Sequence, residues 1–195
     1  MKNTLTLQEM LDKTDKRKPG FELMIAHLRT CKYPLIVETG VSRQEDNYFG
    51  DGQSTLIWDA IANELTGTVH SVDIDPNSCK FVRNNCSEKV MIWCSDSIKW
   101  LATKEVEYGK LNRSIDLLYL DSYDIDIKNW HPSALHHIYE LLSIKKALRP
   151  GTLVAVDDNL IIDGEHIGKG TYVAEFMKRV GKKQIYDGYQ WVFEW

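Results

Sequence analysis

The chain has 195 residues and a formal net charge of −4, and 43% of its residues are hydrophobic and 27% charged. This length suits one well-buried domain, and the acidic balance gives no electrostatic reason to expect nucleic acid or an anionic membrane as a partner. No stretch approaches the ~20 apolar residues of a membrane span, and the N-terminus has no apolar signal segment. Four cysteines without a CxxC pair suit free thiols in a reducing compartment. We therefore expect a cytoplasmic protein.

Predicted strands and helices alternate along most of the chain. We expect one domain over residues 1–195, with an N-terminal helical segment over 1–32 and an α/β core over 33–195. The predicted strands are Leu35–Glu38, Thr68–Asp73, Val90–Cys94, Ile115–Leu120 and Thr152–Val156, and the predicted helices are Thr6–Lys13, Phe21–Thr30, Ser54–Leu65, Pro76–Cys86, Ser97–Lys104, Ser133–Leu148 and Thr171–Val180. This alternation predicts a parallel sheet with helices on both faces.

The C-terminal end has a different pattern. Two strand-like stretches, Lys183–Tyr186 and Gln190–Trp195, flank the dipeptide Asp187-Gly188. Such a dipeptide is a strong hairpin signal, so we expect the sheet to close with an antiparallel strand.

The stretch Leu35–Thr55 has the form of a nucleotide-binding turn. A short apolar strand ends at Glu38, and Gly40 interrupts the strand pattern. A pair of glycines, Gly50 and Gly52, then precedes the helix that begins near Ser54. Glycines allow a ligand to approach the backbone, and the first N–H groups of a helix are free to bind it. The polar insert Val41–Phe49 between the two glycine segments predicts a lid over a ligand or a contact to it.

Candidate ligand-binding residues, most of them acidic or polar, stand at the end of all five predicted parallel strands. They are Glu38, Thr39 and Gly40 after the first strand, Asp73 and Ile74 after the second, Ser95 and Asp96 after the third, Asp121 after the fourth, and Asp157, Asp158 and Asn159 after the fifth. In an open α/β sheet ligands bind beyond the carboxyl ends of the strands. Because clustered carboxylates repel one another, stability does not explain them, and they predict a binding site.

Two of these acids have a ligand role and a structural alternative. Asp73 follows Gly52 by 21 residues, close to the ~20-residue interval typical of an acid that binds ribose hydroxyls. The alternative, capping the next helix, suits Asp75 better. Asp96 either accepts a hydrogen bond from an adenine amino group or caps the helix that begins near Ser97.

The order of these motifs resembles the class I S-adenosylmethionine-dependent methyltransferases. The matching segments are ETG…GDGQST, VDIDP and CSDS, together with the closing hairpin. The resemblance implies a Rossmann-like methyltransferase sheet, mostly parallel, and a bound S-adenosylmethionine. By position it implies that the cofactor is bound by Glu38, Thr39, Gly40, Gly52, Ser54, Asp73, Ile74, Ser95, Asp96 and Asp121.

A narrower resemblance is to the cation-dependent O-methyltransferases of the catechol O-methyltransferase type. It rests on Asp121 and on LRPGTLVAVDDN, and it implies Mg²⁺ held by Asp121, Asp158 and Asn159, all with the oxygen ligands that this ion prefers. That family's general base is a lysine near Asp121, which this chain lacks there. Asp124 or His166 would then take the proton, besides Asp121, and the acceptor would be a small hydroxylated molecule or a sugar.

Several alternatives remain at this point. A methyltransferase could work without metal, the fold could bind a nucleotide cofactor without turnover, or GDGQST could be a degenerate nicotinamide-binding motif. The segment Gly168-Lys169-Gly170 lacks the spacing of a phosphate-binding loop and predicts a flexible lid. The oligomeric state is not predicted.

Overall fold

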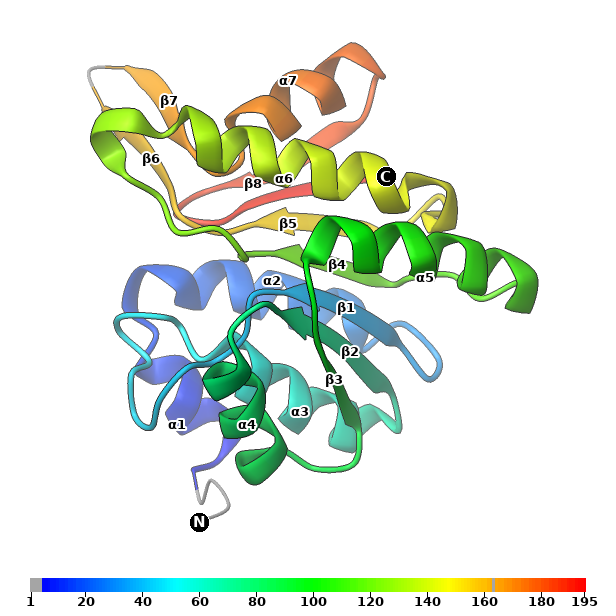
Figure 1. The fold of residues 1–195 in the computed structure, drawn as a ribbon. Coiled ribbons are helices and arrows are strands. Elements are labelled where there is room, and N and C mark those ends of the chain that lie inside the picture. Colours follow the sequence, from blue (N-terminus) through cyan, green and yellow to red (C-terminus); the bar gives the residue numbers. More distant parts are fainter. Residues whose placement is uncertain (1–4, 163) are drawn as a thin grey trace.

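The computed structural model describes residues 5–162 and 164–195 and contains a seven-stranded sheet (Figure 1). Its strand order is β3-β2-β1-β4-β5-β9-β8. The strands are β1 (Leu35–Thr39), β2 (Thr68–Asp73), β3 (Val90–Cys94), β4 (Leu117–Leu120), β5 (Leu153–Val156), β8 (Lys183–Asp187) and β9 (Trp191–Glu194). Strands β1 to β5 pair in parallel, and β9 runs antiparallel to both β5 and β8. The predicted fold class is thus confirmed.

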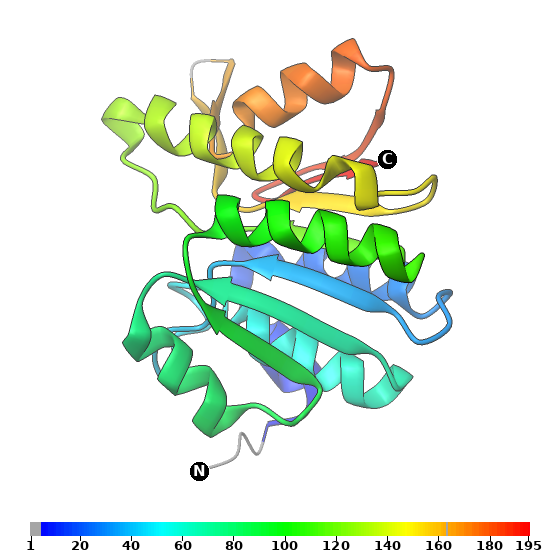
Figure 2. The ribbon, with the colours of Figure 1, turned by 45° about the vertical axis from the view of Figure 1, so that its right-hand side comes forward.

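Helices cover both faces of the sheet (Figures 1 and 2). One face carries α1 (Leu7–Asp12), α2 (Lys18–Leu28), α3 (Ser54–Leu65) and α4 (Pro76–Asn85), and the other carries α5 (Ser97–Leu111), α6 (His131–Ile144) and α7 (Thr171–Arg179). Short 3-10 turns lie at Asp15–Arg17, Ile127–Asn129 and Lys145–Ala147. Within the described part of the chain, no helix is long and apolar enough to cross a membrane.

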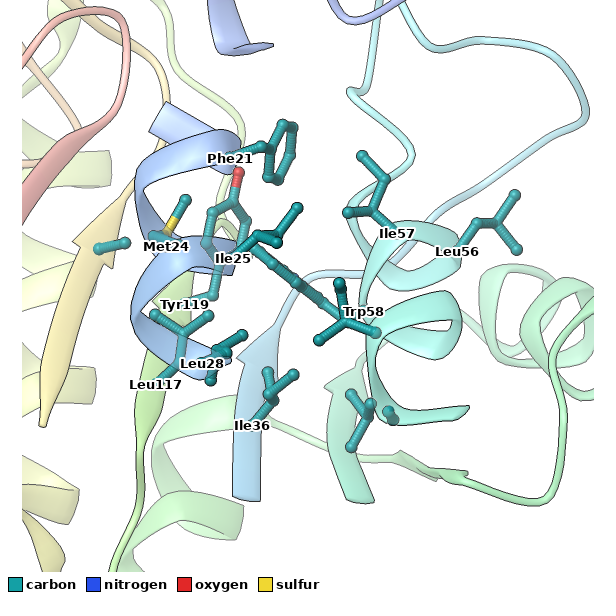
Figure 3. Packing of buried hydrophobic residues seen from close by; sticks show 14 of the residues in the cluster. Phe21, Met24, Ile25, Leu28, Ile36, Leu56, Ile57, Trp58, Leu117 and Tyr119 are labelled. Atoms are coloured by element: carbon teal, nitrogen blue, oxygen red, sulfur yellow. The ribbon is translucent and has the colours of Figure 1, made fainter. Parts of the chain in front are cut away.

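The N-terminal helices belong to the hydrophobic core. Phe21 of α2 lies edge-on to Trp58 of α3 at a ring-centroid distance of 5.3 Å, and Trp58 lies 5.4 Å from Tyr119 of β4 (Figure 3). All three rings are buried. Because this packing fixes α2 against the sheet, it also fixes the turn just before it, which carries Arg17 to the carboxyl ends of the strands.

Some boundaries differ from those predicted. Helix α5 continues seven residues beyond Lys104 because Tyr108 extends its buried face, and it ends where Asn112 adopts a left-handed conformation. Helix α2 begins three residues earlier than expected, since Pro19 fits its first turn. The hairpin expected at Asp187-Gly188 is present, but its loop spans residues 188–190, because Asp187 still pairs with Trp191.

A second, two-stranded sheet was not predicted. It consists of β6 (Asn159–Ile162) and β7 (Glu165–Gly168), which pair antiparallel immediately after β5. The exposed Ile161 and Ile162 obscure the alternation of apolar and polar residues that marks a half-buried hairpin. This hairpin matters for the site because it returns the chain to the end of β5.

Gly40 closes the gap between the ends of β1 and β4. It has φ +74°, and a Cβ there would collide with the carbonyl oxygen of Asp121 and lie 2.8 Å from Cα of Ser122. We expect Gly40→Ala to lower the free energy of unfolding by about 2–4 kcal/mol, from left-handed strain and overpacking. Urea denaturation measures this.

The matched control is Gly109→Ala, in the exposed part of α5, where a new Cβ meets no atom within 4 Å. This change should stabilise the helix by about 0.5–1 kcal/mol. Equal effects of the two substitutions would contradict the role given to Gly40.

Candidate active site

Two cavities lie at the carboxyl ends of the parallel strands. The first, which we call the β2–β3 cavity, has a volume of about 340 Å³ and is lined by Asp73, Ile74, Asp96, Ser97, Tyr123 and His136, among others. The second, the β4–β5 cavity, has a volume of about 320 Å³ and is lined by Arg17, Arg43, Asp51, Asp121, Asp124 and Asp158, among others. The segment 121–124 contributes to both, so the cavities are neighbours.

Asp73 and Ile74 project from the end of β2 into the β2–β3 cavity. The Asp73 carboxylate accepts hydrogen bonds from the backbone N–H of Val41, at 3.1 Å, and of Asp75, at 2.8 Å. Burial raises the pKa of Asp73 above its ordinary value. Ile74 is 74% exposed, which leaves an apolar surface beside a carboxylate. This is the pairing that a nucleoside requires, since its base is flat and its ribose carries hydroxyls.

The capping alternatives are decided by two hydrogen bonds. Asp75 caps α4 by accepting from the N–H of Asn77 at 3.0 Å, so Asp73 is not the cap. Asp96 does cap α5, accepting from the N–H of Lys99 at 2.9 Å, while it also lines the β2–β3 cavity. Ser95 is half-buried and its N–H donates to the carbonyl of Asp73. The residue after β3 is therefore hydrogen-bonded directly to the end of β2.

Glu38, predicted to contact the cofactor, is not among the residues that line either cavity. Its carboxylate is fully buried and accepts hydrogen bonds from the hydroxyls of Ser54, Thr55 and Ser71 at 2.7–2.9 Å. Because Ser54 donates to Glu38, its hydroxyl is directed at this buried acid. The acid thus joins the start of α3 to β1 and β2, and it shapes the turn rather than lining a binding surface.

Two further predicted cofactor residues also act on the shape of the site. Thr39 is buried, and its hydroxyl donates to Glu140 of α6 at 3.0 Å. Gly52 has φ +72°, and a Cβ there would lie 2.8 Å from Cδ of Arg17. Thr39 and Gly52 are held by close packing, and neither is among the residues that line the two cavities.

The buried Glu38 should give stability a distinctive pH dependence. Burial raises its pKa from 4.5 to about 7, although the three hydroxyls oppose this. The folded protein therefore holds a proton that the unfolded chain releases, so the contribution to stability is full below pH 4.5 and is lost as pH rises to about 7. Glu38→Gln should remove about 3 kcal/mol of this decline, measured by urea denaturation at pH 4.5 and pH 8.

Glu64 provides the control for this prediction. It lies near the surface, and its hydrogen bonds from Arg29 lower its pKa, so Glu64→Gln should produce a small trend of opposite sign. If Glu38→Gln and the unchanged protein lose stability in parallel across this range, Glu38 is ionised in the folded state and the account of this residue fails.

The β4–β5 cavity contains a buried network of charges. Lys169 binds Oδ1 of Asp121 and lies 2.8 Å from Oδ2 of Asp158. Arg17 binds Oδ1 of Asp158 at 2.8 Å and Oδ2 of Asp157 at 2.7 Å. Both cationic side chains are at most 3% exposed, whereas Asp121 and Asp158 keep 15% and 17% of their side-chain surface open. The open faces of these two carboxylates are part of the surface that the cavity presents to a ligand.

The two carboxylates differ in their proton affinity. Burial raises the pKa of Asp121 well above its ordinary value, with Asp157 and Asp158 adding to the effect and Lys169 opposing it. Burial acts on Asp158 in the same direction, but Lys169 and Arg17 outweigh it and hold its pKa at about 2. Asp121 is therefore the better proton acceptor of the pair.

The amide of Asn159, predicted as a metal ligand, is engaged in hydrogen bonds of the turn after β5. Its Oδ1 accepts from the N–H of Gly170 at 2.7 Å, and its Nδ2 donates to the carbonyls of Val156 and Asp157. The side chain is buried and fixes the turn after β5. No group of three or more His, Cys, Asp or Glu side chains in the described residues has an arrangement that could hold a metal ion.

His166 and Asp124, the two residues proposed as general bases besides Asp121, lie in different surroundings. His166 lies on β7 with its ring 5.1 Å from that of the buried Trp191, and it is not among the described residues that line either cavity. Asp124 lines the β4–β5 cavity but makes a two-point ion pair with Arg43, at 2.9 and 2.5 Å, and these hydrogen bonds lower its pKa. His166 is therefore outside the lining of both cavities, and Asp124 is held by Arg43.

The polar insert 41–49 forms one wall of the β4–β5 cavity. Arg43 crosses from the insert to Asp124, and the carbonyl of Phe49 accepts a hydrogen bond from Arg17 at 3.3 Å. Tyr48 is buried in the core, whereas Phe49 is 71% exposed. The insert is thus anchored through Arg43 and Phe49, and its last residue, Phe49, has an exposed aromatic ring.

Sequence reasoning missed Lys169, Arg17 and Tyr189. Tyr189 donates to Asp158 at 2.5 Å from the loop between β8 and β9. The glycines on both sides of Lys169 were a usable signal, because each is close-packed against Asn159, and a Cβ on either would lie within 2.7 Å of its Oδ1. The segment 168–170 is buried, so the prediction of a flexible lid there is wrong.

Comparison by sequence finds no matching family model and no matching curated protein. Solved structures do match by fold. The MycE methyltransferase of mycinamycin biosynthesis, in complex with Mg and SAH, has a TM-score of 0.63 at 14% identity over 98% of this chain and 55% of that one. CalS11, a TDP-rhamnose 3'-O-methyltransferase of calicheamicin biosynthesis, has a TM-score of 0.59 at 13% identity over 96% and 80%.

Human N-acetylserotonin methyltransferase in complex with SAM also matches, with a TM-score of 0.53 at 13% identity over 96% of this chain and 54% of that one. The chain spans about half the length of MycE. These likenesses establish the fold, which is the Rossmann-like fold of S-adenosylmethionine-dependent methyltransferases.

Proposed function

We propose that the chain is an S-adenosylmethionine-dependent methyltransferase that methylates a hydroxyl oxygen of a small polar acceptor. The observation that carries this proposal is the pair of neighbouring cavities at the carboxyl ends of the strands, one suited to a nucleoside and one polar and acidic. Because segment 121–124 borders both, a methyl group carried in the first cavity can reach an oxygen held in the second.

In the β2–β3 cavity, the proposed cofactor contacts are few and distinct. The Asp73 carboxylate accepts hydrogen bonds from the ribose hydroxyls, Ile74 packs on the adenine ring, and Asp96 accepts from the adenine amino group. The methionine part passes the backbone at Gly40, at the carboxyl end of β1. The fold neighbours that contain SAM or SAH support this assignment.

The proposed chemistry is one displacement. A hydroxyl oxygen of the acceptor forms a bond to the methyl carbon, the bond from that carbon to sulfur breaks, and S-adenosylhomocysteine leaves with the electron pair. The hydroxyl proton passes to Asp121, whose raised pKa suits this role. Holding oxygen, carbon and sulfur in line provides most of the acceleration.

The acceptor class follows from the β4–β5 cavity. It contains the side chains of Arg17, Arg43 and Asp51 besides the acids from β4 and β5, and these hydrogen-bond well to several hydroxyls. A sugar or a nucleotide-linked sugar fits this chemistry. The CalS11 neighbour, which acts on TDP-rhamnose, and MycE, which has been solved with mycinamycin VI, give independent support.

The oxygens around Asp121 and Asp158 do not fit a magnesium ion as they are arranged. Lys169 binds both carboxylates, Arg17 and Tyr189 bind the other oxygen of Asp158, and Gly170 binds the Asn159 amide. No step of the proposed mechanism therefore uses a metal. Magnesium stays a prediction from the sequence.

Methyl transfer tests the proposal directly. Incubation with methyl-tritiated S-adenosylmethionine and a panel of sugars and nucleotide-linked sugars should move label into an acceptor in a 1:1 ratio with S-adenosylhomocysteine. If label enters only added protein or nucleic acid, the acceptor class is wrong.

A further inference from the structure

Lys169 is a charged side chain enclosed in the protein. It is fully buried, and it lies in a segment whose backbone is pressed against the end of β5. A Cβ on Gly168 would lie 2.6 Å from the carbonyl of Asp158, and one on Gly170 would lie 2.7 Å from Oδ1 of Asn159. The N–H of Lys169 also donates to that Asp158 carbonyl at 3.3 Å. The position of the lysine is thus fixed by its neighbours on both sides.

The Lys169 ammonium lies between the two carboxylates that the sequence assigns to a divalent cation. It binds Oδ1 of Asp121 and approaches the carbonyl of the same residue at 3.4 Å, and it lies 2.8 Å from Oδ2 of Asp158. An ammonium has three N–H donors, and three oxygens surround this one. Because a buried charge is costly unless paired, the two carboxylates and the lysine stabilise one another.

A second cation reinforces this arrangement. Arg17 binds Oδ1 of Asp158, which also accepts from Tyr189, so both oxygens of Asp158 already have partners. A divalent ion here would have to displace the ammonium and would meet the positive charge of Arg17. Mg²⁺ also demands oxygens in near-octahedral positions, and those of Asp158 and Asn159 are directed elsewhere.

We propose that Lys169 is a built-in replacement for the metal ion, a positioning residue that holds Asp121 and Asp158 together so that their outer faces meet the acceptor without a divalent cation. The role of Lys169 in methyl transfer rests on the proposed function. Its occupation of the position between Asp121 and Asp158 does not. One consequence concerns the acceptor: with no metal to chelate, it needs a single hydroxyl at Asp121 rather than two adjacent ones.

The experiment is a titration with Mn²⁺, followed by electron paramagnetic resonance, of the unchanged protein and of Lys169→Ala. The unchanged protein should bind no Mn²⁺ below millimolar concentration. Lys169→Ala removes the ammonium and leaves two partly exposed carboxylates without the cation between them, so it should bind one Mn²⁺ with a dissociation constant at least about tenfold lower. Mg²⁺ should raise the melting temperature of Lys169→Ala and leave that of the unchanged protein unaltered.

Three variants complete the design. Lys169→Arg keeps a cation and should behave as the unchanged protein, whereas Lys169→Met keeps the length of the side chain and should gain Mn²⁺ binding if the alanine variant does not fold. Lys104→Ala is the matched control, since Lys104 is also buried but pairs with Glu107 away from the site. It should not gain Mn²⁺ binding.

Two results would overturn the proposal. One is stoichiometric Mn²⁺ binding by the unchanged protein that Asp158→Asn abolishes, and the other is a failure of both Lys169→Ala and Lys169→Met to gain any binding. None of these titrations contains S-adenosylmethionine, so a failure of the proposed function would leave their outcome unchanged, and the two can be told apart.

Discussion

Asp73→Asn is expected to weaken S-adenosylmethionine binding by about 10- to 100-fold, the cost of losing charge-assisted hydrogen bonds worth about 1.5–3 kcal/mol. Asparagine keeps one oxygen that can accept from the N–H of Val41, as the carboxylate does at 3.1 Å. The loop after β1 should therefore stay in place, and the loss should come from the ribose contacts. Isothermal titration calorimetry measures it.

Asp75→Asn is the control for this substitution. Asp75 lies two residues away and caps α4, and asparagine is an equally good cap, so binding should change by less than about twofold. If Asp73→Asn binds the cofactor as tightly as the unchanged protein, or if Asp75→Asn loses as much affinity, the cofactor does not lie in the β2–β3 cavity.

Arg17→Met is expected to have the largest effect on stability. Arg17 is 3% exposed and pairs with Asp157, which is fully buried, and with Asp158. Its removal leaves the buried Asp157 carboxylate without its partner, which should lower the free energy of unfolding by about 3–5 kcal/mol. One oxygen of Asp157 already has no hydrogen-bond partner, so the site has no spare donor to compensate. Urea denaturation at pH 7 gives the value.

Arg29→Met is the comparison for Arg17→Met. Arg29 makes a similar ion pair with Glu64 at 2.8 Å, but both side chains are about half exposed, and such pairs contribute at most about 1 kcal/mol. A loss for Arg17→Met no greater than that for Arg29→Met would show that the network around Asp158 does not stabilise the fold as argued here.

The alternation of strands and helices was enough to predict the fold. Strands β4 and β5 are continuous apolar runs, and the other parallel strands are short, mostly apolar stretches bounded by polar residues, so their places follow from local sequence. The β6–β7 hairpin was missed because its exposed Ile161 and Ile162 break the expected alternation. Helix ends moved where a cap or proline, such as Pro19, set the boundary.

The acids of the site were predictable for a geometric reason. Asp73, Asp96, Asp121 and Asp158 directly follow parallel strands, and the ends of such strands must meet at one edge of the sheet. Their charge partners were not predictable in the same way. Arg17 lies 140 residues from Asp157 in the sequence, and only the packing of α2 against β4 brings them together. Lys169 reaches Asp121 and Asp158 because the β6–β7 hairpin brings the chain back to the end of β5, and this hairpin was not predicted.

Side-chain direction was the other limit. Glu38 and Thr39 stand at the end of β1, where nucleotide-binding residues lie. However, Glu38 accepts hydrogen bonds from Ser54 and Ser71, and Thr39 donates one to Glu140. The sequence places a residue at a strand end but does not say toward which layer its side chain turns. Such residues support the binding surface from behind.

The most direct measurement is a calorimetric titration of the unchanged protein with S-adenosylmethionine in buffer containing EDTA. The account predicts binding of one cofactor per chain with a micromolar dissociation constant, and competition by S-adenosylhomocysteine. The absence of binding at millimolar cofactor would contradict it.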